Sequence, residues 1–418
     1  MKEPGYALAL CALGLEKVCA AELSRLGLEV VGREPGRVRF ALGAGSGKAG
    51  PGQAGLSAGR ILARANICLR TAERILIEAA SFRATDFDAL FEGAREVPWE
   101  LFFSREDRLV IERVRLHRSV LAAQTSVQAI VHKAIYERLG KAFGLSRLPE
   151  SGRERSLRVY IEDDEVLLGL DSSGEALHKR GYRQATGEAP LKETVAAGVL
   201  LLAGWNRRLP LLDPFCGSGT ILIEAGLFAQ DRAPGLGRSF GFEDMPSVSR
   251  ADLAAELEAA RSRVRTDADF RIEGSDLSPQ ALEVARANVR TAGLAGRIEL
   301  SQAKAEEARP GYEAGILLCN PPYGERLGTV EESEELYRSL GRTAAAFSGW
   351  GLGYVTNRRD FGEFFGERSV SMHKIMNGAE EQWFHWYPAT RPAPSERATR
   401  PAPSERATRP APADRSTR

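Results

Sequence analysis

Apolar runs and helical patterns alternate along residues 209–356. Five stretches are candidate strands, at residues 209–212, 270–276, 297–300, 316–319 and 351–356. Apolar residues recur at helical spacing at residues 221–225, 279–291 and 331–347. This alternation is typical of a parallel, doubly wound sheet, which binds ligands at the carboxyl ends of its strands. We therefore predict an α/β fold here, followed by a hairpin at residues 370–386.

The amino-terminal half indicates short strands around helices. A strand at residues 6–13, an amphipathic helix at 14–27 and short strands at 29–31 and 37–42 predict a small α+β unit. Glycines are frequent in residues 43–59, which we interpret as a loop. A second unit follows, with helices at 59–69, 86–92 and 126–143 and strands at 74–78, 109–114 and 157–161.

The composition changes near the carboxyl end, where proline-rich nonapeptides begin. Residues 391–417 hold three units, Arg-Pro-Ala-Pro-Ser-Glu-Arg-Ala-Thr twice and a variant once. Because so polar a segment cannot bury a core, we expect a disordered tail whose arginines could assist RNA binding. These changes divide the chain into residues 1–58, 59–172, 173–388 and 389–418.

The net charge of +1 over 418 residues neither supports nor excludes a nucleic-acid partner. Basic side chains nevertheless gather in the second unit, at Arg105, Arg108, Arg113, Arg115, Arg118, Lys133, Arg138, Lys141, Arg147, Arg153, Arg155 and Arg158. Such a surface would suit RNA, whereas interspersed acids such as Glu112 and Glu137 leave an ordinary solvated face as the alternative.

Cysteine and histidine spacing argues against a metal centre. The five cysteines are scattered without a Cys-x-x-Cys pair, and His117 and His132 have no partner at ligand spacing. This pattern argues against a zinc ribbon, an iron–sulfur cluster and a disulfide scaffold, and it fits a reducing cytoplasm. No stretch reaches the roughly 18 apolar residues that cross a bilayer. We expect a soluble, cytoplasmic protein without a metal or membrane partner.

A glycine loop, residues 213–220, follows the strand at 209–212. Gly217 and Gly219 allow a ligand to approach the N-terminus of the next helix closely. A phosphate-binding loop would need Gly-Lys-Ser/Thr, and a dinucleotide fingerprint would need glycine where Leu222 stands. The remaining ligand is S-adenosylmethionine (SAM), whose carboxylate suits amide donors and whose ammonium suits Asp213.

An acid also ends the next strand, where Asp276 can hold two ribose hydroxyls. The alternative is a helix N-cap formed by Asp276 or Ser278, and both roles can coexist. Cys216, like Cys319, is interpreted as a packing residue rather than a nucleophile. We expect ten positions to contact the cofactor: Asp213, Phe215, Cys216, Gly217, Ser218, Gly219, Thr220, Asp276, Leu277 and Asn320.

The candidate catalytic motif, Asn320-Pro321-Pro322-Tyr323, directly follows the apolar run at 316–319. The Asn320 oxygen can accept from an N–H group, the Pro321 carbonyl stays free, and Tyr323 offers a stacking face. Such a clamp suits the amine of a planar base. Alone, the motif could equally be a turn or a proline-rich ligand, but a cofactor loop upstream favours methyl transfer.

A cationic linker at residues 177–183 combines basic side chains with an aromatic one, a mixture that binds phosphates and stacks on bases. A solvated basic turn is the alternative. The candidate RNA-binding residues are His178, Lys179, Arg180, Tyr182, Arg183 and Lys192.

Taken together, these motifs resemble those of the RNA guanine-N2 methyltransferases that carry a THUMP domain. The matching segments are residues 178–183, 189–193, 212–220, 231–235 and 320–327. The resemblance is strongest to members that act on 23S ribosomal RNA, without their fused second methyltransferase. It implies a ferredoxin-like module at 1–58, a THUMP domain at 59–172 and a Rossmann-like, SAM-dependent methyltransferase domain at 173–388.

One position departs from that family. An acid usually follows the third strand and holds the adenine amino group, but Lys304 stands there, with Glu306 and Glu307 slightly later. Lysine cannot accept this hydrogen bond. Either a glutamate shifts into place or the backbone alone contacts adenine.

The resemblance implies methylation of the exocyclic N2 of a guanosine in 23S ribosomal RNA. The nearest alternative is a transfer-RNA guanine-N2 methyltransferase with the same domains. A protein-glutamine or DNA-adenine methyltransferase could share the Asn-Pro-Pro-Tyr motif, but the basic amino-terminal half would then lack a purpose. A non-catalytic RNA-binding assembly factor would require a vestigial SAM site, against which the intact glycine loop argues.

Overall fold

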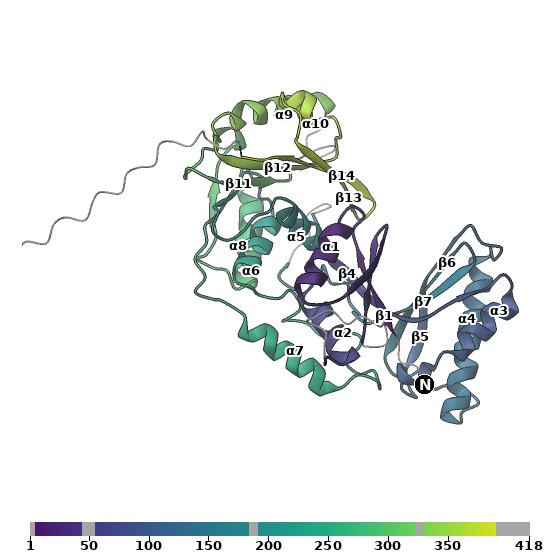
Figure 1. The fold of residues 1–418 in the computed structure, drawn as a ribbon. Helices are drawn as coiled ribbons and strands as arrows, with labels where there is room; N and C mark the ends of the chain where they lie inside the picture. The colour runs from purple at the N-terminus through teal and green to yellow at the C-terminus, as the bar shows by residue number, and fades with distance from the viewer. Residues whose placement is uncertain (1–4, 44–54, 184–190, 323–328, 390–418) are drawn as a thin grey trace, which may run out of the picture.

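The computed structural model describes residues 5–43, 55–183, 191–322 and 329–389, which form two seven-stranded sheets surrounded by helices (Figure 1). Residues 6–171 build the first sheet and residues 211–387 the second. The expectations for Tyr323 and for the nonapeptide tail fall outside the described residues.

The first half of the amino-terminal sheet is a ferredoxin-like βαββαβ unit. Its elements are β1 (Tyr6–Cys11), α1 (Glu16–Arg25), β2 (Val30–Glu34), β3 (Arg37–Ala41), α2 (Ala58–Cys68) and β4 (Ala72–Arg83). β1 pairs antiparallel with both β3 and β4, and β2 pairs with β3. The boundary expected at residue 58 thus lies inside this unit, because α2 and β4 complete it. Local periodicity does not reveal the distant pairing of β4 with β1.

The second half continues the same sheet. Its elements are α3 (Phe87–Glu96), the single turn η2 (Trp99–Leu101), β5 (Arg108–His117), α4 (Gln124–Phe143), β6 (Glu154–Glu162) and β7 (Glu165–Asp171). The first half of β4 pairs with β1 and the second half with β7, which gives the strand order β2-β3-β1-β4-β7-β6-β5. β7 was not among the predicted strands. The two amino-terminal units therefore share one strand.

The carboxy-terminal sheet is doubly wound, as predicted. Its parallel strands are β8 (Leu211–Asp213), β9 (Ile272–Asp276), β10 (Glu299–Gln302), β11 (Gly315–Cys319) and β12 (Trp350–Thr356). An antiparallel hairpin follows, β13 (Ser371–Asn377) and β14 (Glu380–Tyr387). The order is β10-β9-β8-β11-β12-β14-β13, so the sheet reverses its winding between β8 and β11, the place where such folds bind ligands.

The helices of this domain are α5 (Glu193–Leu202), α6 (Thr220–Ala229), α7 (Arg250–Ser262), α8 (Pro279–Thr291), α9 (Val330–Ala344) and α10 (Phe361–Phe365), with the turn η3 (Ala305–Glu307). Every residue of β11 is buried, and Ile316 and Leu318 share a core with Leu222 of α6. A strand covered on both faces requires a continuous apolar sequence. The core therefore fixes the end of β11, from which Asn320 emerges.

A segment between α6 and β9 joins the catalytic domain to the ferredoxin-like unit. We call residues 230–264 the brace segment. Its Glu256 is buried and pairs with Arg60 and Arg64 of α2, at 2.8 Å from Oε1 to Arg60 Nη2 and 2.9 Å from Oε2 to Arg64 Nε. Gly235 lies so close to Ile67 that a Cβ would come within 2.6 Å of the Ile67 Cα. The helix α7 was not predicted from the sequence.

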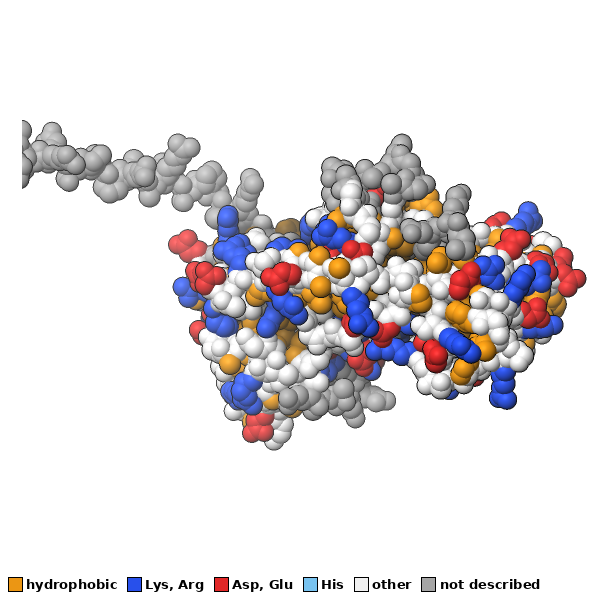
Figure 2. Space-filling model, turned by 90° about the horizontal axis from the view of Figure 1, so that it is seen from below, with side chains coloured by type: hydrophobic (Ala, Val, Ile, Leu, Met, Phe, Trp, Pro, Cys, Tyr) orange, Lys and Arg blue, Asp and Glu red, His pale blue; other side chains and the backbone are white. Residues whose placement is uncertain are grey.

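The brace segment also contacts the second amino-terminal unit. Arg155 of β6 is buried, where its Nε donates to Asp107 Oδ2 at 3.0 Å. Its guanidinium also donates to the carbonyls of Gly241 and Asp244 in the brace segment. All three units are thus held together by buried polar contacts. On the face in Figure 2, Lys and Arg side chains are interspersed with Asp and Glu over the coloured surface.

Candidate functional site

Three of the predicted site residues lie at the carboxyl ends of adjacent strands. Asp213 ends β8, Asp276 ends β9 and Asn320 directly follows β11. Since β8 lies between β9 and β11, the three residues follow one edge of the sheet. The winding of the sheet reverses between β8 and β11, beside these strand ends, and folds of this kind bind ligands at that point. The candidate polar residues therefore lie at the expected ligand-binding position.

Asp213 is a buried carboxyl with one hydrogen bond among the described residues, from the Phe215 N–H to Oδ1 at 3.0 Å. Burial, with a smaller contribution from the nearby Asp276 carboxylate, raises the pKa of this carboxyl to about 8. At neutral pH the protonated form is therefore favoured. A cationic group bound beside Asp213 would stabilise the carboxylate and bring the pKa down.

The glycine loop folds over the Asp276 carboxylate. Gly217 N–H donates to Oδ2 and Ser278 N–H donates to Oδ1, both at 2.9 Å. The Ala281 N–H donates to Ser278 Oγ, so Ser278 is the N-cap of α8. The capping role considered for Asp276 therefore belongs to Ser278. Each Asp276 oxygen keeps a second lone pair, and these lone pairs are the acceptors that two ribose hydroxyls would need. Gly219 has a φ of +82°, which favours glycine at the start of α6.

The two thiols near the loop are packing groups. Cys216 and Cys319 are buried, and burial raises the pKa of each thiol well above its ordinary value. A thiol that resists ionisation is a poor nucleophile. Phe215 packs, partly buried, against the core around β11 and β12.

Within the described residues, the site has one buried oxygen without a hydrogen bond and one exposed apolar side chain. Asn320 Oδ1 is buried and accepts no hydrogen bond, a state that costs on the order of 1–3 kcal/mol. Leu277, beside Asp276, is 62% exposed although it is apolar. Pro321 is buried and Pro322 is half-buried. A ligand with an N–H donor near Asn320 and an apolar face near Leu277 would satisfy both features.

Several linker residues expected to contact RNA are instead turned into the protein. Arg180 and Tyr182 are buried. The Tyr182 hydroxyl donates to Glu224 Oε1 at 3.1 Å, and Arg180 Nε lies 3.6 Å from the same oxygen. Lys192 Nζ pairs with Glu73 at 2.9 Å. Arg180 and Tyr182 therefore do not form the exposed cationic and aromatic surface that the linker sequence suggested.

The other linker residues have separate roles. Lys179 is exposed and pairs with Glu175 at 3.0 Å. His178 is half-buried, and burial lowers its pKa to about 4. Arg183 donates to Thr220 Oγ1 at 2.9 Å, with Ser218 Oγ 3.3 Å from that oxygen. Arg183 thus supports the glycine loop, a role hidden in the sequence because Thr220 lies 37 residues away.

The position expected to hold adenine carries no acid. Lys304 is exposed at the start of η3, and Glu306 and Glu307 are exposed as well. The end of β10 is instead tied to β9, because Gln302 Nε2 donates to the Leu277 carbonyl at 3.2 Å. Gln302 was not predicted to take part in the site.

No group of three or more His, Cys, Asp or Glu side chains among the described residues is arranged to hold a metal ion. In the same ranges, no helix combines the length and the apolar character needed to cross a membrane.

Family models match the chain in three consecutive segments. They describe an RlmL ferredoxin-like domain at residues 7–44, a THUMP domain at 84–171 and an RMKL-like methyltransferase domain at 180–383. The order of the three units agrees with the order expected from the sequence.

Similarity over most of this chain extends to named proteins. "Putative RNA methyltransferase YpsC" of Bacillus subtilis (strain 168) is 35% identical over 390 residues, 92% of this chain and 96% of YpsC. "Ribosomal RNA large subunit methyltransferase K/L" of Photobacterium profundum is 35% identical over 382 residues, 89% of this chain, which spans only 51% of that protein. The solved structure of SMU.472, "a putative methyltransferase complexed with SAH", matches with a TM-score of 0.84 at 33% identity, over 94% of this chain and 100% of SMU.472.

Proposed function

The chain belongs to the family of RNA methyltransferases with an RMKL-like catalytic domain, and from this premise we propose that it methylates the exocyclic N2 of a guanosine in 23S ribosomal RNA. The observation that carries the proposal is the buried Asn320 Oδ1 at the end of β11, which accepts no hydrogen bond from any residue that the structure describes. Such an oxygen suits the N–H donor of a flipped-out base. The ribosomal RNA methyltransferases among the relatives favour ribosomal RNA, and the resemblance of the motifs favours guanine N2.

SAM is the proposed methyl donor, since the other half of the site fits its chemistry and the similar SMU.472 is complexed with S-adenosylhomocysteine (SAH). Asp213 would hold the ammonium group, and the N–H groups at the start of α6 would hold the carboxylate. Asp276 would accept the ribose hydroxyls, and Leu277 would cover the adenine. When bound, SAM supplies a methyl group on a positively charged sulfur.

The residues of the chain would orient the acceptor amine. In the proposed complex, Asn320 Oδ1 accepts one N2 hydrogen and the Pro321 carbonyl accepts the other, so that the nitrogen lone pair points toward the methyl group. The amine becomes acidic only once it is alkylated, so its proton leaves afterwards and no strong base has to act first. Tyr323, outside the described residues, is the proposed stacking partner of the base.

Exchange of Asn320 for alanine tests this clamp. We expect Asn320→Ala to lower kcat at least about a hundredfold, the scale of losing one oriented polar group in an active site. SAH should still bind in a calorimetric titration. Asn320→Asp keeps an acceptor oxygen and should retain more activity than Asn320→Ala. Near-normal turnover by Asn320→Ala would refute the clamp.

A further inference from the structure

A groove lies on the helix-free side of the amino-terminal sheet. In Figure 1, α1 and α2 lie outside one half of the sheet and α3 and α4 lie outside the other, so the uncovered faces of the two halves turn toward each other. A cavity of about 310 Å³ lies between them. We call it the sheet groove, and its lining includes Arg37, Glu73, Arg113, Arg115, Arg158 and Tyr160.

The carboxylates that line the sheet groove already have cationic partners. Glu34 and Glu162 both pair with Arg37, the latter at 3.6 Å from Oε2 to Nη2. Glu73 pairs with Lys192 at 2.9 Å. Each of these acids thus has a cationic partner, with Arg37 shared by Glu34 and Glu162, which reduces their repulsion of an anion in the groove.

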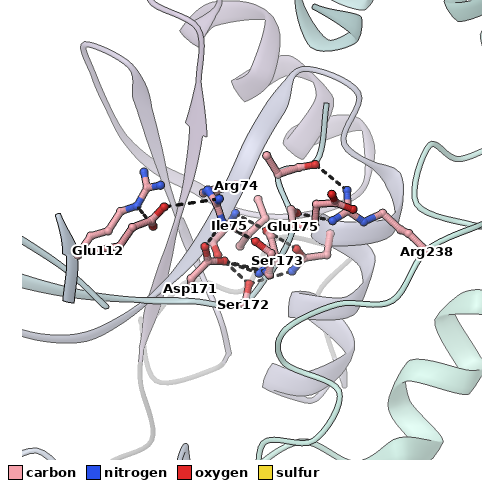
Figure 3. Close-up of polar contacts among 12 residues, drawn as sticks. Arg74, Ile75, Glu112, Asp171, Ser172, Ser173, Glu175 and Arg238 are labelled. Atoms are coloured by element: carbon pink, nitrogen blue, oxygen red, sulfur yellow. Dashed lines mark hydrogen bonds and ion pairs between the residues drawn. The ribbon is translucent and has the colours of Figure 1, made fainter. Parts of the chain in front are cut away.

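Glu112, next to the groove, also has cationic partners. Its Oε2 accepts from Arg158 Nε at 3.0 Å, and its Oε1 lies 3.7 Å from Arg74 Nη2. Figure 3 shows Arg74 placed between Glu112 and Asp171, which ties β4 to β5 and β7. Arg158, which lines the groove, and Arg74 are thus held in position by carboxylates.

Two arginines of the groove lining have no such partner among the described residues. Arg113 and Arg115 lie two residues apart on the edge strand β5, on the same face and opposite Arg158 and Tyr160 of β6. Both are exposed, and neither forms a salt bridge with any of the described residues. Beside them, the Tyr160 ring lies 5.5 Å from the Arg37 guanidinium. Free guanidinium groups next to an aromatic ring suit a phosphate chain with unpaired bases.

The wall of the sheet groove is linked to the cofactor loop by contacts within the protein. Glu73 in this wall holds Lys192, which directly follows Leu191. The carbonyl of Leu191 accepts from the same Arg183 Nη2 that donates to Thr220 of the glycine loop. A chain of direct contacts therefore connects the wall of the groove with the loop proposed to bind SAM.

From these contacts we propose that the sheet groove binds the sugar–phosphate backbone of the substrate RNA, with Arg113 and Arg115 as phosphate contacts. The inference rests on the proposed function, in which the substrate is RNA, and adds the surface that holds it.

Exchange of both arginines for glutamine tests the proposal. With a fluorescein-labelled 23S ribosomal RNA transcript as probe, we expect Arg113→Gln with Arg115→Gln to raise the Kd about tenfold. The slope of log affinity against log salt concentration should become shallower by about 1.4 to 1.8, the share of two phosphate contacts. The kcat at saturating RNA should not change, because neither residue belongs to the catalytic site.

Two control proteins separate the groove from general charge loss. Arg250→Gln with Arg290→Gln removes the same charge from exposed positions on α7 and α8 and should bind the transcript like the wild type. Arg113→Lys with Arg115→Lys should restore the salt slope. A glutamine variant with wild-type Kd and slope would overturn the groove while RNA methylation by the wild type still stood. A wild-type protein that neither binds nor methylates RNA would overturn both proposals.

Discussion

At the residue scale, the Asp213 carboxyl couples cofactor binding to pH. Its pKa of about 8 means that, at neutral pH, it has to lose a proton to pair with a ligand ammonium. We therefore expect the Kd for SAH to fall as the pH rises toward 8, by up to about tenfold per pH unit, and to level off above it. Calorimetric titrations across this range measure the effect.

Asp213→Asn is the control for that pH dependence. The amide cannot ionise, so this variant should bind SAH weakly, with a Kd that does not change between about pH 6 and 8. A wild-type Kd that is equally flat would show that ionisation of Asp213 is not coupled to cofactor binding.

The exposed Leu277 gives a second prediction at this scale. Because its side chain is 62% exposed, Leu277→Ala should leave the thermal midpoint of unfolding unchanged. The Kd for SAH should rise about tenfold, since apolar atoms that the ligand would cover are lost. Val120→Ala is a matched control, with an apolar side chain that is 70% exposed elsewhere. Unchanged SAH binding by Leu277→Ala would exclude the adenine contact.

The residues of the site were easier to predict than their partners. Asp213, Asp276 and Asn320 each end or directly follow a predicted strand, so the sequence alone places them at strand ends, and the order of the sheet brings those ends together. The burial of Tyr182 could not be predicted in this way. Its partner Glu224 lies 42 residues later, and a basic linker carries no signal that an acid will cover it.

At the element scale, the contact of α7 with α2 should contribute measurably to stability. Glu256→Gln removes the charge that pairs with Arg60 and Arg64. We expect the free energy of unfolding to fall by about 1–3 kcal/mol, because a buried group loses charged hydrogen bonds. Urea denaturation measures the loss. Glu258→Gln, exposed on the same helix, should be neutral; equal midpoints for the two variants would contradict this role of Glu256.

Most elements with a local signal were predicted, but β7 was missed although its signal is local, and the pairing of distant strands was not predicted. The strand β7 follows β6 after Asp163 and Asp164, whose φ values of +51° and +64° form the tight turn of a two-residue hairpin. The Asp-Asp pair that forms this turn is visible in the sequence. The pairing of β4 with both β1 and β7 is not, since these two partners lie at opposite ends of the amino-terminal half.

At the scale of the whole molecule, the brace segment holds the amino-terminal sheet and the catalytic domain together through Glu256 and Arg155. An RNA in the sheet groove would then meet the catalytic site at a set distance. The net charge of +1 gave no sign of this surface. Acids and bases are interspersed in Figure 2, and the proposed RNA contacts are only those arginines that carboxylates leave free.

The central claim is methylation of guanine N2 in 23S ribosomal RNA. The most direct measurement is mass spectrometric mapping of methylated nucleosides in ribosomal and transfer RNA from a deletion strain. We expect one N2-methylguanosine to be lost from 23S ribosomal RNA and to return with the wild-type gene, but not with Asn320→Ala. Loss of a methylated adenosine, loss from transfer RNA alone, or no loss at all would contradict the account.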